Sequence, residues 1–313
     1  MGFTDTQVYE QCNDLWIITS YFNPCHYKTK RTNFEMFERT ILDSNLKLLT
    51  VECAFEDDNF ELPPSPHILR VRCSDVLWQR ERLLNLAINS LPDTSGKIAW
   101  IDCDILFSNK HWAVQTSEML EQLPIVQPFQ KVTRLSQGAD GQGESWDSFG
   151  YVTQTIPRLS AKAKFDLHGH TGFAWAARME ILRKYGLYDG SISGGVDHLM
   201  AHAMLGEFDS PCLVRIIGSS DSMFRKHFLE WATPLYTEIK GQVGYIPGNV
   251  VHLWHGDDLD RKYLERHESI RLLDFNPYTD LRIGKDSVWE WNSHKPQLHK
   301  WARNYFKERR EDG

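Results

Sequence analysis

One stretch of the sequence combines a strand pattern with two carboxylates, and it reads Lys97-Ile98-Ala99-Trp100-Ile101-Asp102-Cys103-Asp104-Ile105-Leu106-Phe107. Residues 97–101 have the length and apolar character of a buried β-strand, so Asp102 and Asp104 follow at its carboxyl end. Unpaired carboxylates are costly to bury in an apolar run, and a positive partner is therefore expected beside them. Mg²⁺ and Mn²⁺ take oxygen ligands and commonly join carboxylates to substrate phosphates. The stretch predicts a divalent metal site, although two Asp residues at this spacing also arise by chance.

Strand and helix patterns alternate around this stretch. Apolar runs predict strands at residues 15–22, 46–55, 68–71 and 125–129, and helical spacing of apolar residues predicts helices at 33–42, 76–91 and 112–123. This alternation is typical of an α/β fold with a doubly wound, mostly parallel sheet. Ligands of such sheets bind beyond the carboxyl ends of the strands, where Asp102 and Asp104 are predicted to lie.

The second half of the chain is less regular. Helical spacing predicts helices at residues 176–185 and 198–205. Residues 136–148 are rich in Gly, Ser, Gln and Asp, which predicts a flexible loop that is either an active-site lid or an ordinary surface loop. The charged residues 307–312 are expected to be solvated.

Composition limits the class of protein. The chain has 313 residues, of which 41% are hydrophobic and 25% charged, with 11 Trp and a formal net charge of −7. This profile is typical of a globular protein, and the length fits one large α/β domain with an appendage. Proteins that hold long nucleic acids are usually net basic, so the acidic charge disfavours DNA as an acceptor.

The sequence also bears on the cellular compartment. No apolar run approaches the roughly 18 to 20 residues of a membrane span, and the first residues lack the basic and apolar regions of a signal peptide. We therefore expect a soluble, cytoplasmic protein. The cysteines are scattered without a Cys-X-X-Cys pair, so reduced thiols are expected in preference to disulfides or zinc ligands. They are Cys12, Cys25, Cys53, Cys73, Cys103 and Cys212.

Two further segments carry candidate site residues. The first reads His170-Thr171-Gly172-Phe173-Ala174-Trp175-Ala176, then Tyr185-Gly186-Leu187-Tyr188-Asp189-Gly190, then Gly194-Gly195-Val196-Asp197-His198. The second reads Val250-Val251-His252-Leu253-Trp254-His255-Gly256, an apolar run with two histidines three residues apart. Neutral imidazole suits Mn²⁺ better than Mg²⁺, so a histidine ligand would favour manganese.

Together these segments resemble the GT-A glycosyltransferases, in which an Asp-X-Asp motif follows a hydrophobic strand and holds the metal and the nucleotide-sugar diphosphate. The segment from residue 170 to 198 is similar to the acceptor-side block of β-1,4-galactosyltransferases and polypeptide N-acetylgalactosaminyltransferases. In the galactosyltransferases this block reads Gly-Gly-Glu-Asp, with the Asp as general base. Here Val196 replaces the Glu, and Asp197 falls on the position of the base. The resemblance covers roughly residues 95–260.

The resemblance implies a GT-A fold and a metal-dependent transfer of sugar from a nucleotide-diphosphate donor, with UDP expected, to an acceptor hydroxyl. The transfer inverts the anomeric centre if Asp197 deprotonates the acceptor for direct attack. The implied transferase domain is 1–260, with a nucleotide-sugar half at about 10–130 and an acceptor half at about 150–260. Residues 261–313 are expected to form a C-terminal helical and loop extension.

The predicted site residues fall into three groups. The metal, Mn²⁺ or Mg²⁺, is held by Asp102, Asp104 and one of His252 or His255, with His252 preferred because it leaves its strand first. The donor is contacted by Asp75, Trp78, Arg80, Asp102, Arg261 and Lys262, although Arg80 could be an exposed helix residue, and Arg261 and Lys262 could be surface charges. The acceptor is contacted by Trp175, Gly194, Gly195 and His198, with Asp197 as the catalytic base.

Other functions stay open. A nucleotidyltransferase also uses Asp and Mg²⁺ in a doubly wound sheet, but its Gly-rich basic loop is missing from Tyr21-Phe22-Asn23-Pro24. A non-catalytic carbohydrate-binding protein would stack its Trp residues on sugars and use the Asp pair for a structural metal. Within the transferases, the acceptor could be a glycan, a protein or, in a viral type of enzyme, a modified DNA base.

Overall fold

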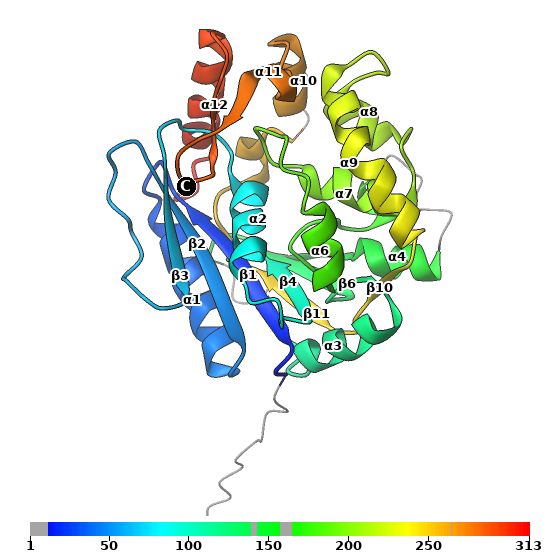
Figure 1. Ribbon diagram of the computed structural model, residues 1–313. Coiled ribbons are helices and arrows are strands. Elements are labelled where there is room, and N and C mark those ends of the chain that lie inside the picture. The colour runs from blue at the N-terminus through cyan, green and yellow to red at the C-terminus, as the bar shows by residue number, and fades with distance from the viewer. Residues whose placement is uncertain (1–11, 139–142, 157–164, 264) are drawn as a thin grey trace, which may run out of the picture.

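The computed structural model describes residues 12–138, 143–156, 165–263 and 265–313. Its centre is a seven-stranded sheet in the order β10-β6-β9-β4-β1-β2-β3 (Figure 1). The strands are β1 (Leu15–Phe22), β2 (Lys47–Phe55), β3 (Ile68–Cys73), β4 (Lys97–Ile101), β6 (Ile125–Gln127), β9 (Ala174–Arg178) and β10 (Val243–Tyr245). Neighbouring strands are parallel except at β9, which runs antiparallel to β4 and β6. The predicted α/β fold with a mostly parallel central sheet is confirmed.

Helices cover both faces of this sheet (Figure 1). They are α1 (Lys28–Asp43), α2 (Arg80–Ser90), α3 (Trp112–Gln122), α4 (Phe149–Thr155), α5 (Phe165–His168), α6 (Met179–Tyr185), α7 (Val196–Leu205), α8 (Pro211–Ile217) and α9 (Met223–Ile239). Because side chains alternate along a strand, Ile17 of β1 joins the core with α1 and α3, and Ile18 joins the core with α2, α6, α7 and α9. This double burial explains the continuous apolar runs of the strands.

A second sheet has the order β5-β11-β7-β8. Its strands are β5 (Ile105–Phe107), β7 (Lys131–Leu135), β8 (Gly143–Asp147) and β11 (Asn249–His252). β11 runs antiparallel to β5, and His252 is paired with Ile105. The last residue of β11 therefore lies beside Asp104, which precedes β5.

The C-terminal segment packs against the first half of the chain. It contains η2 (Asp258–Arg261), α10 (Glu265–Leu272), α11 (Pro277–Asp280), β12 (Leu281–Ile283), β13 (Trp289–Trp291) and α12 (Pro296–Glu308). The ring of Phe306 in α12 lies 6.1 Å from Phe22 and 6.2 Å from Trp78, between ring centroids. The segment thus belongs to the same hydrophobic core as the sheet, and the proposed domain boundary at residue 260 stays a prediction.

Four expectations about local structure need correction. The helix predicted from residue 76 begins at Arg80, because the Gln79 side chain instead pairs with the backbone of Trp289. The first part of the helix predicted at 176–185 is the end of β9, since helical spacing cannot distinguish a short, fully buried strand from a helix. Part of the loop predicted at 136–148 forms β8, and residues 139–142 lie outside the described residues.

The fourth correction concerns the tail at 307–312. Arg309 and Glu311 are buried, with exposed fractions of 8% and 3%. They are paired with each other, which offsets the cost of burying each charge. The tail is therefore part of the folded structure and is not fully solvated.

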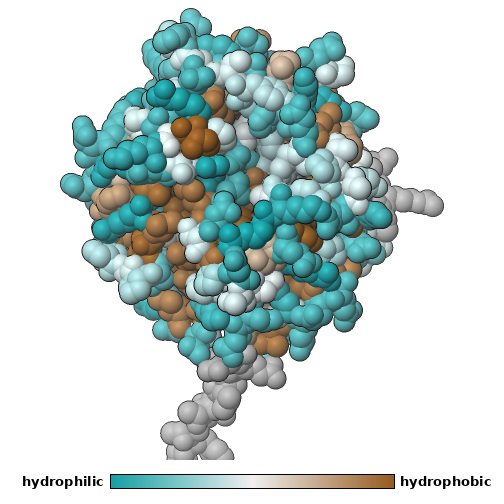
Figure 2. Space-filling view, viewed as in Figure 1, coloured by the Kyte–Doolittle hydropathy of each residue, from teal (hydrophilic) through white to brown (hydrophobic). Residues whose placement is uncertain are grey.

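The surface, the helices and the thiols bear on the remaining expectations. Figure 2 shows one face as mostly hydrophilic, with apolar residues gathered on the left of the view. Among the described helices, none combines the length and hydropathy needed to cross a bilayer. None of the six cysteines, all of which lie in the described residues, forms a disulfide.

Candidate functional site

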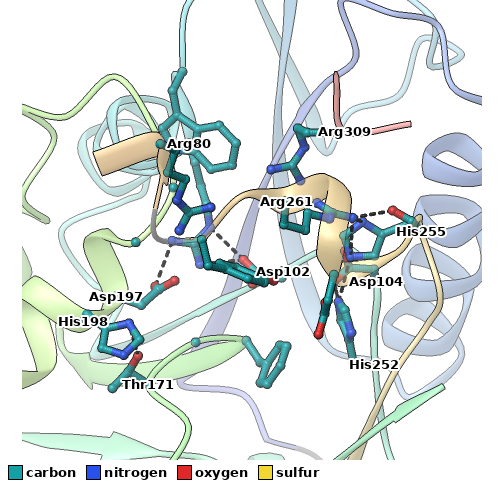
Figure 3. Close-up of a pocket in the computed structure, with 18 of the residues that line it drawn as sticks. Arg80, Asp102, Asp104, Thr171, Asp197, His198, His252, His255, Arg261 and Arg309 are labelled. Atoms are coloured by element: carbon teal, nitrogen blue, oxygen red, sulfur yellow. Dashed lines mark hydrogen bonds and ion pairs between the residues drawn. The ribbon is translucent and has the colours of Figure 1, made fainter. Parts of the chain in front are cut away.

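A cavity of about 400 Å³ opens at the carboxyl ends of β1 and β4. Of the residues predicted for the site, those that line it are Trp78, Arg80, Asp102, Asp104, Gly194, Gly195, Asp197, His198, His252, His255 and Arg261. Figure 3 places Arg80 and Asp197 on one side and Asp104, His252 and His255 on the other, with Asp102 between them. Segments from both ends of the described chain, from Ser20 to Arg309, thus meet in one cavity.

Three predicted residues do not line this cavity. Trp175 is 1% exposed, and its indole N–H donates to the backbone oxygen of Thr171 at 2.7 Å, because its place in β9 directs the ring into the core. Asp75 accepts the backbone N–H of Trp291 at 2.9 Å. Lys262 pairs at the surface with Glu308, 2.8 Å away. The predictions of substrate contact for Trp175 and of donor contact for Asp75 and Lys262 are therefore dropped.

Asp104, His252 and His255 form a group of metal-ligand type. One donor atom from each lies within 4.8 Å of the others. Nε2 of His255 lies 3.1 Å from Oδ2 of Asp104, and the Nε2 atoms of the two histidines lie 2.8 Å apart. Oδ1 of Asp104 is buried and accepts no hydrogen bond, which is unusual for a carboxylate oxygen. Two imidazoles and a carboxylate with an unsatisfied oxygen fit a borderline cation such as Mn²⁺.

The two histidines are neutral at physiological pH. Burial and the positive charge of Arg261 lower the pKa of His255 to about 4. Burial, together with the charges of Arg134 and Arg261, places the pKa of His252 well below its usual range. Neutral imidazole is the form that binds metals, so the cavity keeps both histidines ready as ligands.

Asp102 does not join this group, and its predicted role as a metal ligand stays a prediction. Residues 102–104 form a turn between β4 and β5, so the two Asp side chains do not share one face as they would in a continuous strand. Oδ1 of Asp102 instead accepts a hydrogen bond from Nε of Arg80 at 2.7 Å. Burial raises the pKa of Asp102, Arg80 opposes this effect, and Asp104 adds to it.

Asp197 lies in the first turn of α7, after the Gly194-Gly195 turn. Gly195 has φ 102°, and a Cβ there would lie 2.9 Å from the ring of His267, so only glycine fits. Oδ1 of Asp197 lies 3.1 Å from Nη1 of Arg80. Burial raises the pKa of Asp197 to about 7, because the nearby Asp102 and Glu81 offset much of the effect of Arg80. A carboxylate with a near-neutral pKa can act as a general base.

Known proteins provide limited comparison. No protein-family model and no curated protein sequence matches the chain. Several solved structures are similar to this chain. A mutant of Drosophila β1,4-galactosyltransferase 7, solved with manganese, UDP-Gal and xylobiose, covers 92% of this chain and 98% of its own at 10% identity, with a TM-score of 0.41.

Two further solved structures are similar at the same level. A putative nucleotide-diphospho-sugar transferase from Desulfovibrio desulfuricans covers 94% of this chain and 96% of its own at 11% identity, with a TM-score of 0.33. A glycosyltransferase involved in glycosylation of the major capsid of PBCV-1 covers 76% of this chain and 91% of its own at 10% identity, with a TM-score of 0.32. Likeness at this level transfers neither substrate nor mechanism, so both are argued from the site.

The cavity is more basic than the sequence suggests. Its lining includes seven cationic side chains and four carboxylates, although the whole chain carries a net charge of −7. Further lining residues that were not predicted for the site are Lys30, Arg134, His170, Arg215, Arg266, His267 and Arg309. They come from distant elements and show no common spacing, so no local pattern reveals them. Their gathering makes the cavity suited to an anionic ligand.

Glu311 forms ion pairs with two cationic residues of the cavity wall, Arg261 and Arg309. Its Oε1 lies 2.7 Å from Nε of Arg309 and 3.3 Å from Nη1 of Arg261. Arg261 also hydrogen-bonds to the ring and the backbone oxygen of His255. Burial would raise the pKa of Glu311, but Lys30, His255 and Arg261 lower it to about 2. The C-terminal tail therefore fixes one wall of the cavity.

Proposed function

We propose that this chain is a metal-dependent glycosyltransferase that moves a sugar from a nucleotide-diphosphate donor, expected to be UDP, to an acceptor hydroxyl. The observation that carries the proposal is the coexistence of three features in one cavity. They are the donor group of Asp104, His252 and His255, the cationic wall, and Asp197 with its near-neutral pKa. Sugar transfer needs a neutralised diphosphate leaving group and an activated acceptor hydroxyl, and these residues can supply both.

The metal would be held by Asp104, His252 and His255, and the two imidazoles favour Mn²⁺ over Mg²⁺. When bound, it neutralises charge that develops on the diphosphate as the sugar leaves. The side chains of Arg261, Arg309 and Lys30 line the cavity, and they can balance the remaining phosphate charge.

Asp197 is the proposed general base. It accepts the proton of the acceptor hydroxyl as that oxygen attacks the anomeric carbon, a contribution of about 10²- to 10⁴-fold in rate. Arg80 touches both Asp197 and Asp102 and therefore orients the base. Gly194, Gly195 and His198 flank Asp197 and are placed to contact the acceptor. Trp78 lines the cavity, and its ring stacks on Phe306 with 6.2 Å between ring centroids. We therefore propose that Trp78 shapes the wall of the donor site and does not stack on the donor itself.

Direct attack by an acceptor that Asp197 deprotonates inverts the anomeric centre, and this stereochemistry is part of the proposal. The anomeric coupling of the product, measured by NMR, checks it. A product with retained configuration would contradict the role of Asp197 as base.

The deciding experiment is a titration of UDP into the protein, by calorimetry, with and without Mn²⁺. A panel of nucleotide-sugars is then assayed for release of the nucleoside diphosphate. The proposal expects UDP binding that needs Mn²⁺ and slow hydrolysis of one donor without any acceptor. Metal-dependent binding without turnover of any donor would favour the non-catalytic carbohydrate-binding alternative. The absence of UDP binding both with and without Mn²⁺ would contradict the proposal.

A further inference from the structure

A second group of metal-ligand type lies next to the proposed active site. It consists of His168, His198 and Cys212, with one donor atom from each within 4.8 Å of the others. His168 and Cys212 are 0% exposed. Nε2 of His168 lies 3.5 Å from Sγ of Cys212. The three side chains come from the end of α5, the first turn of α7 and the first turn of α8.

The distance between the His168 and Cys212 donors matches that in a tetrahedral zinc site. Zn–S bonds of about 2.3 Å and Zn–N bonds of about 2.0 to 2.1 Å place neighbouring ligand atoms of a tetrahedron about 3.5 Å apart. The distance between Nε2 of His168 and Sγ of Cys212 equals this value within its precision. A thiolate with imidazoles and no carboxylate selects zinc over the oxygen-seeking Mg²⁺ and Mn²⁺.

The surroundings of the histidines also suit metal ligands. Nδ1 of His168 hydrogen-bonds the backbone oxygen of Gly169 at 2.8 Å, which leaves Nε2 as the unprotonated atom directed at Cys212. Nδ1 of His202, one turn after His198 on α7, hydrogen-bonds Oε2 of Glu207 at 2.7 Å. Such bonds to the far nitrogen fix the tautomer and orientation of metal-bound histidines.

His202 adds a fourth candidate donor. Its ring centroid lies 5.3 Å from that of His168, and its buried Nε2 makes no hydrogen bond to any described residue.

We propose that His168, His198 and Cys212 bind a Zn²⁺ ion, with His202 as the fourth ligand, in a structural site separate from the Asp104 site. Zn²⁺ takes the place of the Cys212 proton, which is released to solvent. The ion connects α5, α7 and α8, and His198 is the residue after Asp197. The zinc site therefore fixes the position of the first turn of α7 and, through it, the carboxylate that faces Arg80.

The sequence gives no zinc pattern because its ligands are 30 and 14 residues apart and no Cys-X-X-Cys pair is present. The inference is independent of the sugar-transfer proposal. Either could fail alone, since the zinc test reads metal content and spectra and not turnover.

The first test uses the unmodified protein. Full-length chain produced in zinc-containing medium is desalted and analysed by inductively coupled plasma mass spectrometry. We expect about one zinc per chain, in keeping with a structural site that binds its ion tightly. Its removal by a strong chelator should lower the thermal midpoint. A protein that is folded, free of zinc and unable to take up added zinc would overturn the proposal.

The second test replaces zinc with Co²⁺, which reports its ligands spectroscopically. A thiolate-to-cobalt charge-transfer band is expected in the near ultraviolet for the unmodified protein. It should be absent in Cys212→Ser, and His168→Gln should bind Co²⁺ at least about tenfold more weakly. Cys25→Ser is the matched control, because Cys25 lies outside the cluster and is expected to leave the band unchanged.

Asp104→Asn separates the two metal sites. It should keep the thiolate band, because Asp104 belongs to the other group. Loss of the band in Asp104→Asn, or its persistence in Cys212→Ser, would contradict the assignment. If Cys212→Ser fails to fold by circular dichroism, the zinc content of the unmodified protein decides alone.

Discussion

Nη1 of Arg80 lies 3.1 Å from Oδ1 of Asp197, so the proposed base is paired with a buried cation. The same guanidinium donates to Asp102 at 2.7 Å and to Glu81 at 2.8 Å. One arginine thus serves three carboxylates, and burial, together with the charges of Asp102 and Glu81, accounts for the high pKa of Asp197. The pairing makes Arg80 a positioning residue whose loss should affect both stability and pH dependence.

Replacing this arginine tests the pairing. Arg80→Gln leaves three carboxylates buried without their cation, and removal of one partner of a buried pair costs about 3 to 5 kcal/mol. Urea unfolding at pH 7 should show a loss of this size. Because Arg80 lowers the pKa of Asp197, the acid limb of kcat/KM should move to higher pH in the variant. Arg31→Gln is the control, since Arg31 forms an exposed pair with Glu35, and its loss should change stability by about 0.5 kcal/mol or less.

Asp197→Asn tests the base. In the unmodified protein kcat/KM should fall as the pH drops below about 7, because the base becomes protonated. In the variant, kcat should fall by about 10²-fold or more while UDP binding is retained, because a base acts in the transition state. Unchanged kcat would exclude Asp197 from this role.

The same substitution has a predicted effect on stability. The folded pKa of Asp197, about 7, is raised above the ordinary value of 3.8, so the carboxylate destabilises the fold increasingly between those pH values. Asp197→Asn should therefore be more stable than the unmodified protein at pH 8, by up to about 4 kcal/mol, and nearly equal to it at pH 4. Unfolding curves at both pH values check this. Asp93→Asn, at a fully exposed position, should show no such difference.

The positions of secondary-structure elements could be predicted from the sequence where one local pattern decides the structure. Buried parallel strands are covered on both faces, and their apolar runs located β1, β2 and β4 closely. The candidate metal group could also be predicted from the sequence, because Asp104 lies between two apolar strand patterns and His252 ends a third, and the structure pairs His252 with Ile105 beside Asp104. β9 was partly taken for a helix because its Ala-rich run carries little strand signal.

Contacts between distant charges could not be predicted in this way. Asp102 and Arg80 are 22 residues apart, and their pairing depends on how α2 packs against β1 and β2. The buried Glu311 looked like a solvated tail residue, since a charge run is normally exposed. Only the folded chain shows that Arg261 and Arg309 converge on it.

Substitutions of Asp102 and Asp104 should have different effects on metal-dependent binding and on turnover. Asp104→Asn removes an oxygen ligand, so Mn²⁺-dependent UDP binding should weaken by about tenfold or more. Asp102→Asn should keep this binding but lose turnover, because it releases Arg80. Calorimetry with UDP and Mn²⁺, paired with single-turnover kinetics, distinguishes the two. Equal loss of metal-dependent binding in both variants would restore Asp102 as a ligand and contradict the structural separation.

Glu311→Gln tests whether the C-terminal tail stabilises the cavity wall. The folded pKa of Glu311, about 2, lies below its ordinary value of 4.5, so its charge stabilises the fold above about pH 4.5 and the contribution is lost as the pH falls towards 2. The shift corresponds to about 3 kcal/mol at pH 7, and at pH 3 less than half of this difference between protein and variant should remain.

The measurement is urea unfolding of both proteins at pH 7 and pH 3, together with UDP titration at pH 7. Because Arg261 and Arg309 lose their common partner, metal-dependent UDP affinity should fall as well. Glu308→Gln is the matched control in the same tail, since its exposed pair with Lys262 should be worth about 0.5 kcal/mol or less at either pH. A stability loss in Glu311→Gln that is the same at pH 3 as at pH 7 would mean that packing, and not the carboxylate charge, explains the effect of this residue.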